Sequence, residues 1–473
     1  MKTFLIFMLI FTTSLLAQDH LTKPAVNRAD FIKGADLSEL LAIETHGGVF
    51  TENGLPKDAL AIFSDHGINY VRLRIWHTPA QGYNNLDRTL QMASRIKSAG
   101  LKFLLDFHYS DTWADPAQQA KPAAWATAPF ETLKDSVFQY TRQVMTALKQ
   151  QNTLPDMVQI GNEIICGLLW NDGRVCDPFN NSQHWSQLAE LIGEGLRGVN
   201  ESLDPGDTVR TMIHIDRGGD NGGSRWFFDH LLAQNVEFDI IGLSFYTWWH
   251  GSLSTLESNL HDLAQRYGKA IILVETAYPW TLAWNDNTNN IVGTSSQLHP
   301  GYPATVAGQK NFLYDILNIV RNIPNNKGAG VFYWAPDWIA APQWGSPWEN
   351  LALFDFSGEV LNSIDAFDST LSGLSEIPNS PYSFHLDQNY PNPFNPDTRI
   401  RYELPQSSQV ILKIYNILGQ EVRKLVDRFQ IAGAYSVVWD GKNEAGQQLS
   451  SGAYIYTLQS GNERQWRKML LLK

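Results

Sequence analysis

From about residue 30 to residue 370, short apolar runs alternate with longer amphipathic runs. Eight apolar runs have the length and composition of buried strands; they span 31–36, 69–76, 101–108, 156–163, 208–216, 238–246, 270–278 and 328–336. The amphipathic runs predict helices, at 55–67, 87–100, 131–151, 184–203, 223–234, 253–267 and 303–322. Eight strand–helix units of this size indicate a (β/α)8 TIM barrel, with a doubly wound open sheet as the alternative.

Polar side chains gather where these strands end, which favours the barrel. They occur on seven of the eight strands: Arg72, Arg74, Asp106, His108, Asn162, Glu163, His214, Asp216, Tyr246, Glu275 and Trp334. One polar residue at a strand end is usually a loop residue. A repeated set fits the carboxyl-terminal rim of a barrel, where the active sites of such enzymes lie.

Two of these residues, Glu163 and Glu275, suit the cleavage of a glycosidic bond. That reaction commonly uses one carboxyl group as proton donor and a second as nucleophile or base. The two groups need different pKa values, and ends of separate strands give them different surroundings. Either Glu alone could equally be a rim residue in a salt bridge.

The pair also resembles that of the large clan of retaining barrel glycosidases, which carry an Asn-Glu acid/base after strand four and a nucleophilic Glu after strand seven. Asn162-Glu163 and Glu275 stand at those places. The resemblance implies retention, with carboxyl groups about 5–5.5 Å apart. Arg72 is expected to keep Glu275 ionised, Tyr246 to donate to it, and Asn162 to bond the sugar 2-hydroxyl. Arg74 has the same strand parity as Arg72 and could share its role or pair elsewhere.

A narrower resemblance covers roughly residues 30–365. The stretch HYSDTWADP (108–116) resembles the arabinogalactan endo-β-1,4-galactanases, glycoside hydrolase family 53. FIKGADLSEL, VRLRIW, MVQIGNEI, DIIGLSFY and FYWAPDW agree with the same family. The likeness implies β-1,4-galactan as substrate. It adds the expected substrate-binding residues His108, Asp111, Trp113, His214 and Trp334, although a His at a strand end is often only a structural hydrogen bonder.

Composition agrees with a neutral polysaccharide as substrate. The chain has 16 Trp, whose flat faces suit stacking on sugars but also fill large cores. Trp125 and Trp344 are further candidates, and Trp125 could simply pack a loop. The net charge is −12, and residues 381–473 carry 11 Lys or Arg against 8 Asp or Glu, which leaves about −15 for the rest. An acidic body argues against nucleic acid and polyanionic substrates. We expect no cofactor for the chemistry, and a monomer.

The loop after Glu275 and the two cysteines raise two further expectations. Some bacterial members of the resembled family bind Ca²⁺ in this loop, where Asp286, Asn287 and Asn290 offer oxygen ligands; a polar loop without metal is the alternative. Cys166 and Cys176 are the only cysteines, and in an exported protein they predict a disulfide.

Both ends of the sequence indicate export. Lys2, the apolar run 4–11 and Ala17 predict a signal peptide at 1–17, and no Cys follows it as a lipid anchor would need. We place the barrel at 28–370, a linker at 371–384 and a small all-β, immunoglobulin-like sandwich at 385–473. Its predicted strands are 400–404, 409–417, 434–441, 452–460 and 465–473.

The C-terminal part resembles a type IX secretion sorting domain, through NYPNPFNP (389–396), IYNILGQEV (414–422) and the basic end RKMLLLK. The resemblance implies contact with a secretion machinery and a secreted or cell-surface location. A carbohydrate-binding module is the alternative, with Trp439 and Trp466 as its candidate aromatics.

Two other functions stay open for the barrel. It could be another retaining glycosidase of the clan that cuts β-mannan, xylan or glucan, although HYSDTWADP argues against this. It could also be a non-catalytic glycan-binding surface protein, which the joint presence of Glu163, Glu275 and Arg72 disfavours.

Overall fold

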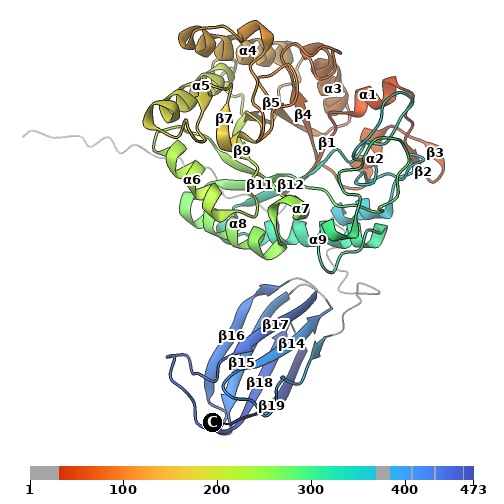
Figure 1. Cartoon of the computed structure of the whole chain (residues 1–473). Helices are drawn as coiled ribbons and strands as arrows, with labels where there is room; N and C mark the ends of the chain where they lie inside the picture. The colour runs from red at the N-terminus through yellow and green to blue at the C-terminus, as the bar shows by residue number, and fades with distance from the viewer. Residues whose placement is uncertain (1–30, 369–383, 406–407, 431–432, 462, 473) are drawn as a thin grey trace, which may run out of the picture.

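A computed structural model describes residues 31–368, 384–405, 408–430, 433–461 and 463–472. Its first part is a closed barrel of parallel strands ringed by helices (Figure 1). The strands are β1 (Ile32–Asp36), β4 (Tyr70–Ile75), β5 (Lys102–Phe107), β6 (Met157–Ile160), β9 (Arg210–Ile215), β10 (Ile240–Ser244), β11 (Ala270–Glu275) and β12 (Gly328–Trp334). Each pairs with the next in the chain, and β12 pairs with β1. The TIM-barrel prediction is confirmed, and the open sheet is excluded.

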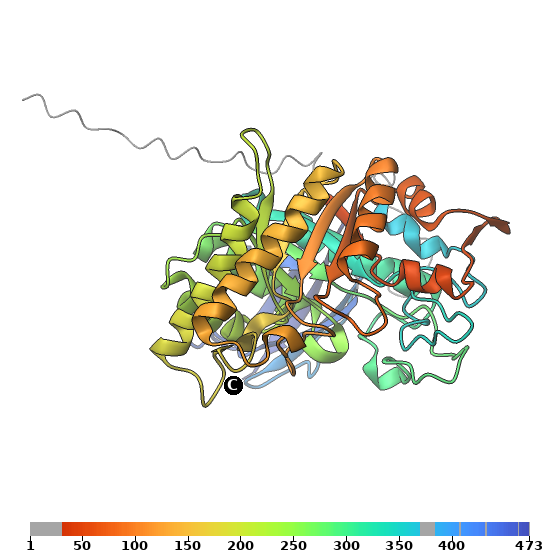
Figure 2. The same cartoon turned by 90° about the horizontal axis from the view of Figure 1, so that it is seen from above.

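Helices cover the outside of the barrel, as the view from above shows (Figure 2). They are α1 (Leu40–Thr45), α2 (Ala59–Asp65), α3 (Leu86–Ser98), α4 (Phe130–Gln150), α5 (Ser182–Asn200), α6 (Asn221–Leu232), α7 (Thr247–His250), α8 (Leu253–Tyr267) and α9 (Val306–Arg321). The predicted helix at 253–267 is correct at both ends. The helix predicted from residue 55 begins at Ala59, because the Asp58 side chain caps it and Leu55–Pro56 form the short strand β3.

The barrel interior has two levels. The lower level is apolar and holds Ile32, Tyr70, Leu104, Met157, Met212, Ile240, Ile272, Val274, Ala329 and Phe332. Side chains two residues further along several of these strands point the same way, because strand side chains alternate. The upper level is therefore polar, with Arg72, Asp106, Gln159 and His214 two residues after members of the lower level and Ser244 four residues after Ile240, all buried. The alternation of side chains along the strands therefore places a layer of polar residues above a layer of apolar ones inside the barrel.

Two short hairpins decorate the loops of the barrel. Strand β2 (Thr51–Glu52) pairs with β3, and β7 (Gly167–Leu168) pairs with β8 (Gly173–Arg174). Single turns of 3-10 helix lie at Ala123–Trp125, Ile164–Cys166, Ser295–Gln297 and Pro324–Asn326, and a longer one at Asn362–Phe367.

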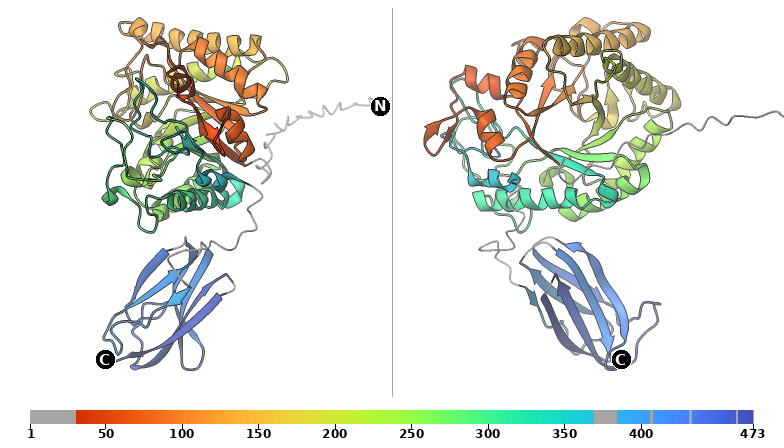
Figure 3. Two further views of the ribbon diagram at one scale, coloured as in Figure 1. Left: turned by 90° about the vertical axis from the view of Figure 1, so that its right-hand side faces the viewer. Right: turned by 180° about the vertical axis from the view of Figure 1, so that it is seen from behind.

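The second part is an all-β sandwich of two antiparallel sheets (Figure 3). One sheet has the order β13-β14-β17 and the other β16-β15-β18-β19. The strands are β13 (His385–Leu386), β14 (Thr398–Leu404), β15 (Ser408–Asn416), β16 (Glu421–Gln430), β17 (Gly433–Trp439), β18 (Gly452–Ser460) and β19 (Glu463–Leu471). Strand β16 was not predicted, because its charged residues hide the alternation of an edge strand. Trp439 is buried in this core, so of the two candidate aromatics only Trp466 is exposed.

Several sequence predictions lie outside the described residues. The signal peptide at 1–17 is among them, and so is the linker at 371–384 except for its last residue. In the described ranges, no helix combines the length and apolarity required to cross a membrane.

Candidate active site

Glu275 stands at the end of β11 and is 6% exposed. A register shift in the pairing of β10 with β11 skips one residue, so that Ser244 lies opposite Glu275 rather than opposite Val274. Val274 points into the apolar interior. Simple alternation would therefore aim Glu275 away from the site, and the shift turns it back. Irregularities of this kind commonly re-aim side chains next to active sites.

Two donors hold the Glu275 carboxylate. Arg72 Nη1 donates to Oε1 at 2.9 Å, and the Tyr246 hydroxyl donates to Oε2 at 3.1 Å. Burial raises the pKa of Glu275 to about 7, while Arg72 acts against that rise. Arg72 thus acts in the predicted direction, but desolvation of the carboxylate outweighs it.

Arg72 serves several acceptors at once, which explains its limited effect on Glu275. Its Nη1 also donates to Asp36 at 2.7 Å, and its Nη2 donates to Asp106 at 2.8 Å and to Asn162 Oδ1 at 2.9 Å. The guanidinium is 1% exposed and therefore neutralises a buried cluster of carboxylates. Arg74 does not share these acceptors. It pairs elsewhere, with Glu39, which was the second alternative for this residue.

Glu163 reaches the site from a bent backbone after β6. Gly161 has φ 81° and Glu163 itself has φ 49°, in the left-handed region that is costly for a residue with a side chain. Strain of this kind persists where the surrounding structure enforces it, often at functional sites. The Glu163 side chain keeps part of its surface accessible and accepts a hydrogen bond from Ser244 Oγ at 2.6 Å.

The two carboxyl groups are close neighbours. One oxygen of each, with a ring nitrogen of His214, lies within 4.8 Å of the others. Burial raises the pKa of Glu163 well above its ordinary value, and Glu275 and Asp216 add to the rise. The site therefore contains one carboxyl group held by a cation, Glu275, and one, Glu163, that forms no ion pair with a described residue.

The two predicted histidines are buried and bonded to protein groups. His108 lies 3.1 Å from Asp106 through Nε2, and its Nδ1 accepts from Trp76 Nε1 and from the Ala114 backbone, each at 3.2 Å. His214 is 0% exposed, and its two ring nitrogens contact Gln159 and Ser244. Their contacts match the alternative reading, in which each His orders the site through hydrogen bonds.

Aromatic rings line the upper edge of the barrel next to these residues. Trp113 is half-buried, with the Arg74 guanidinium 4.0 Å from its ring centroid and Trp334 6.0 Å away. Trp334 also packs edge-on against Trp348 at 4.6 Å. Trp125 packs against Tyr140 beneath the loop after β5, as its alternative reading proposed.

Asp111 organises the loop that contains Trp113. Its two carboxylate oxygens accept from the backbone N–H groups of Thr78 and Ala123, each at 2.8 Å. Both oxygens are thus engaged within the protein. Asp111 therefore supports the loop that carries Trp113 through these two backbone contacts.

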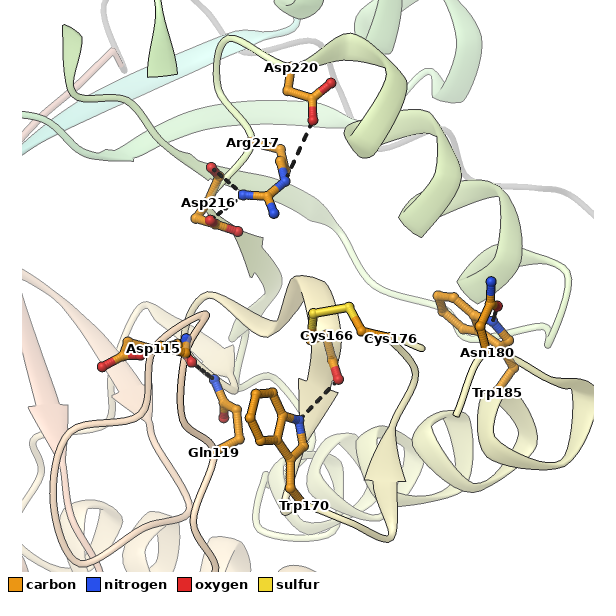
Figure 4. The surroundings of a disulfide bond; sticks show 11 residues. Asp115, Gln119, Cys166, Trp170, Cys176, Asn180, Trp185, Asp216, Arg217 and Asp220 are labelled. Carbon is orange, nitrogen blue, oxygen red and sulfur yellow. Dashed lines mark hydrogen bonds and ion pairs between the residues drawn. A yellow bond between two sulfur atoms is a disulfide. The ribbon is translucent and has the colours of Figure 1, made fainter. Parts of the chain in front are cut away.

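A disulfide between Cys166 and Cys176 closes the loop that follows Glu163 (Figure 4). Within this loop, Trp170 Nε1 donates to the Cys166 carbonyl at 3.0 Å, and the Trp170 N–H donates to Gln119. The Gln119 side chain in turn donates to the Asn162 carbonyl at 2.8 Å. The cross-linked loop therefore supports the backbone that carries the Asn-Glu pair.

Comparison with known proteins identifies the family. The family model for glycosyl hydrolase family 53 matches residues 32–367. The chain belongs to glycosyl hydrolase family 53. The sandwich matches the FlgD Ig-like domain over residues 392–463.

Relatives of this family 53 hydrolase align over nearly their whole length. An "Uncharacterized protein in bgaB 5'region" of Niallia circulans is 49% identical over 74% of this chain and 97% of its own. The "Endo-beta-1,4-galactanase" of Bacillus subtilis (strain 168) is 33% identical over 73% and 87%. The solved "Ignisphaera aggregans GH53 catalytic domain" is 36% identical, with a TM-score of 0.68 over 73% of this chain and 99% of that one. The barrel is thus a glycoside hydrolase domain.

The loop of the family 53 hydrolase that follows β11 contains the residues predicted to bind metal. Asp286 accepts from the N–H groups of Thr288 at 2.6 Å and Ser346 at 2.7 Å, and Asn287 is exposed. Asn290 Oδ1 and Glu349 Oε2 are buried and have no hydrogen-bond partner among the described residues. Unpartnered buried oxygens beside a carboxylate suit a hard cation. Glu349 was missed because it comes from a different loop.

Sequence reasoning also missed Ser244 and Gln159 as site residues. Ser244 precedes Tyr246 by two residues on the same strand segment, so its parity was visible, but serine offers no chemistry of its own to draw attention. Gln159 lies two residues before Gly161, the glycine that follows β6, and donates to Asp106 at 2.7 Å. Both residues act through contacts between strands, which a single sequence does not display.

Proposed function

We propose that this family 53 hydrolase is an endo-acting retaining enzyme that cleaves β-1,4-galactosidic bonds in galactan and type I arabinogalactan. The observation that carries the proposal is the pair of carboxyl oxygens within 4.8 Å, one held by Arg72 and one not. So short a distance agrees with the separation of about 5–5.5 Å in retaining enzymes rather than the roughly 6.5–9.5 Å of inverting ones, and it suits a double displacement. The Bacillus subtilis relative named as an endo-β-1,4-galactanase supports the substrate.

In this proposal Glu275 is the nucleophile. Its ionised carboxylate attacks the anomeric carbon, and a covalent glycosyl-enzyme forms as the glycosidic C–O bond breaks. Arg72 and Tyr246 donate to its two oxygens and hold it in one orientation. These donors favour the ionised form over the protonated one.

Glu163 is the acid and then the base. Its raised pKa favours the protonated form, and this proton passes to the leaving oxygen. The resulting carboxylate takes a proton from water, which attacks the glycosyl-enzyme and restores the starting state. Approach from opposite faces in the two steps gives net retention at the anomeric carbon.

Neighbouring side chains would bind the sugar. Asn162 has its oxygen on Arg72 and donates one N–H to the Ala114 carbonyl at 2.9 Å, which leaves its second N–H for a 2-hydroxyl. Trp113 and Trp334 are half-buried and offer ring faces for stacking. His108 and His214 would order the donors and acceptors around that sugar.

The decisive experiment is product analysis on unbranched β-1,4-galactan, comparing the parent enzyme with Glu275→Gln. Short galactooligosaccharides from the parent and none from the variant would support the reaction, the substrate and the nucleophile together. Release of products from β-mannan or xylan instead would replace the substrate but keep the mechanism. Binding of galactan without any cleavage by the parent would favour a glycan-binding surface protein.

We further propose that the enzyme is exported and that residues 385–473 act as a sorting domain for a secretion machinery. Lys2, the apolar run 4–11 and Ala17 support a signal peptide, and the NYPNPFNP stretch supports the sorting role. Mass spectrometry of enzyme recovered from culture medium tests the first cleavage, which is expected after Ala17. Deletion of 385–473 is expected to leave the enzyme inside the cell envelope, and normal secretion of the truncated chain would contradict the sorting role.

A structural Ca²⁺ is the third part of the proposal. Asp286, Asn290 and Glu349 would supply oxygen ligands, and the ion would brace the loops after β11 and β12. Added Ca²⁺ is expected to raise the melting temperature of the parent and not that of Asp286→Ala. A melting temperature insensitive to Ca²⁺ and to chelator would favour the metal-free polar loop.

A further inference from the structure

We propose that Ser244 and His214 are positioning residues that decide which oxygen of Glu163 carries the catalytic proton. The inference deepens the proposed function, since it rests on Glu163 as the acid. Neither residue needs to touch the sugar for this role. Both are 0% exposed and lie directly behind the Glu163 carboxyl group.

A short hydrogen-bond chain connects the three residues. Ser244 Oγ donates to Glu163 Oε1 at 2.6 Å, and His214 Nε2 lies 2.8 Å from the same Oγ. The chain crosses three neighbouring strand ends, because His214 is on β9, Ser244 on β10 and Glu163 just after β6. Its direction depends on which His214 nitrogen carries the proton.

The surroundings of Nδ1 settle that direction. The Glu163 backbone N–H points at Nδ1 from 3.4 Å and Gln159 Nε2 lies 3.0 Å from it, so Nδ1 faces two donors. Asn162 Oδ1 is also 3.0 Å away, but it already accepts from Arg72 Nη2 at 2.9 Å. The Glu163 backbone N–H, in contrast, can only donate. We therefore assign Nδ1 as the acceptor and place the ring proton of His214 on Nε2.

A proton on Nε2 fixes the rest of the chain. His214 donates to Ser244 Oγ, so the single hydroxyl proton of Ser244 is free to donate to Glu163 Oε1. A proton on Glu163 Oε1 would then point at the hydroxyl proton of Ser244, and the two would repel each other. The acid form of Glu163 is left with Oε2 as its protonated oxygen, and among the described residues no hydrogen bond occupies Oε2. The chain therefore presents the proton on the oxygen that protein groups leave open.

The charges around both groups are compatible with this state. Glu163 faces Glu275 and Asp216, which disfavour its ionised form, and Arg72, which favours it; Tyr246 lies close enough to sense its charge. His214 is surrounded by Arg72, His108 and His250. Burial, followed by these three groups, lowers the pKa of His214 well below its ordinary value. His214 stays neutral, as a ring with one donor and one acceptor must be.

A comparison of two leaving groups tests the proposal. Ser244→Ala is expected to lower kcat/KM on galactan about 10- to 100-fold, within the range of about 10²–10⁴ that acid catalysis contributes. On a dinitrophenyl β-galactobioside, whose leaving group needs no proton, the loss is expected to stay within about threefold. Equal losses on both substrates would mean that Ser244 only supports the fold, and would overturn the proposal.

Two variants control for packing. Ser363 is also 0% exposed and donates its hydroxyl to Gln309, and among the described residues its side chain has no hydrogen bond to either catalytic carboxyl group. Ser363→Ala is therefore expected to leave the ratio of kcat/KM on the two substrates unchanged. Ser244→Thr keeps the hydroxyl and is expected to recover most of the galactan activity. If Ser244→Thr melts at the parent temperature but behaves like Ser244→Ala, the hydroxyl is not the active feature and the proposal fails.

A spectroscopic test is independent of the substrate. Carbon-detected NMR of labelled glutamate, assigned with Glu163→Gln, is expected to show a higher Glu163 pKa in Ser244→Ala, because the lost hydrogen bond favours the carboxylate. Ring nitrogen shifts of His214 are expected to report the Nε2–H tautomer. An unchanged Glu163 pKa, or an Nδ1–H tautomer, would overturn the proposal even if galactan proves to be the wrong substrate. Loss of galactan cleavage in the parent with these NMR results intact would instead refute the proposed function alone.

Discussion

The surroundings of Glu275 and Glu163 differ although both carboxyl groups belong to one rim. Glu275 contacts a buried guanidinium and a tyrosine hydroxyl. Among the described residues, the Glu163 side chain has one hydrogen bond, from a serine hydroxyl, and two other carboxyl groups lie nearby. Both lose hydration, which raises both pKa values, but only Glu275 receives a compensating positive charge in contact.

The difference shows how a barrel of equivalent strands can give two glutamates different tendencies to ionise. Each strand of the barrel offers one position at its end, and the identity of the neighbour there decides the ionisation of the carboxyl group. Arg72 on β4 reaches Glu275 across the top of the barrel, while β10 gives Glu163 the neutral Ser244. The different neighbours of the two carboxyl groups, rather than different depths of burial, make one the nucleophile and the other the acid.

The largest effect is expected from removal of the nucleophile. Glu275→Ala should lose about 10⁴-fold or more in kcat on every substrate, because no other group can form the glycosyl-enzyme. Azide is small enough to occupy the space left by the side chain and should restore turnover with a dinitrophenyl galactobioside. The product is expected to be the α-configured azide, identified by NMR.

Removal of the acid should have a smaller and substrate-dependent effect. Glu163→Ala is expected to lose about 10²–10⁴-fold on galactan but little on the dinitrophenyl substrate in the first step. Azide should here attack the glycosyl-enzyme and give the β-configured product. If the two variants give the same azide anomer, the assignment of unequal roles is wrong.

Arg72→Met tests the compensating charge itself. Loss of a buried partner leaves Asp36, Asp106 and Glu275 without their cation, which should lower the free energy of unfolding by about 3–5 kcal/mol. Denaturant unfolding at neutral pH measures the change. Arg197→Met is the matched control, since Arg197 pairs on the surface with Glu194 and Glu201 and should matter far less.

Glu163→Gln should stabilise the protein, by an amount that grows as the pH rises above about 4.5 and levels off once the folded Glu163 ionises. The folded state holds the Glu163 proton more tightly than the unfolded chain, whose pKa is near 4.5. The parent therefore loses stability as the pH rises above that value, by about 1.4 kcal/mol for each unit of pKa shift, until the folded group ionises. A neutral amide avoids this loss.

Melting temperatures across the pH range measure the effect of Glu163→Gln. Glu275→Gln serves as the comparison, because it removes a raised pKa but also a contact with Arg72, so a smaller gain is expected. A Glu163→Gln curve parallel to that of the parent would show that Glu163 is not an uncompensated buried acid.

Much of this arrangement could be predicted from the sequence, because periodicity reports directly on buried strands. All eight barrel strands lie within the predicted ranges, and their polar ends mark the rim. Strand β16 was not predicted, because its apolar alternation is interrupted by charged residues: Arg423, Lys424, Asp427 and Arg428. Hydrophobic alternation indicates that one face of a strand is buried, so it predicts poorly those strands that are largely exposed to water.

The finer geometry of the site depended on facts that no local pattern contains. The register shift opposite Ser244 turns Glu275 inward, although alternation from Val274 would turn it outward. Glu349 approaches Asn285 from another loop, and its contact at 2.6 Å depends on the closure of the whole barrel. Tyr246, by contrast, is expected from the resemblance to the clan's residue at the end of strand six, and it makes the expected contact with Glu275.

Tyr246→Phe should have the smallest effect, and it separates the two carboxyl groups by pH. Loss of one hydrogen bond to a charged group is worth about 1.5 kcal/mol, or roughly a tenfold loss in kcat/KM. The Tyr246 hydroxyl favours ionised Glu275, whose pKa is about 7, so its removal should raise that pKa and move the acidic limb of the pH profile upward. The alkaline limb, set by Glu163, should stay in place, whereas Ser244→Ala should move the alkaline limb alone. A shift of both limbs in either variant would mean that the two carboxyl groups share one electrostatic environment and are not set apart by their neighbours.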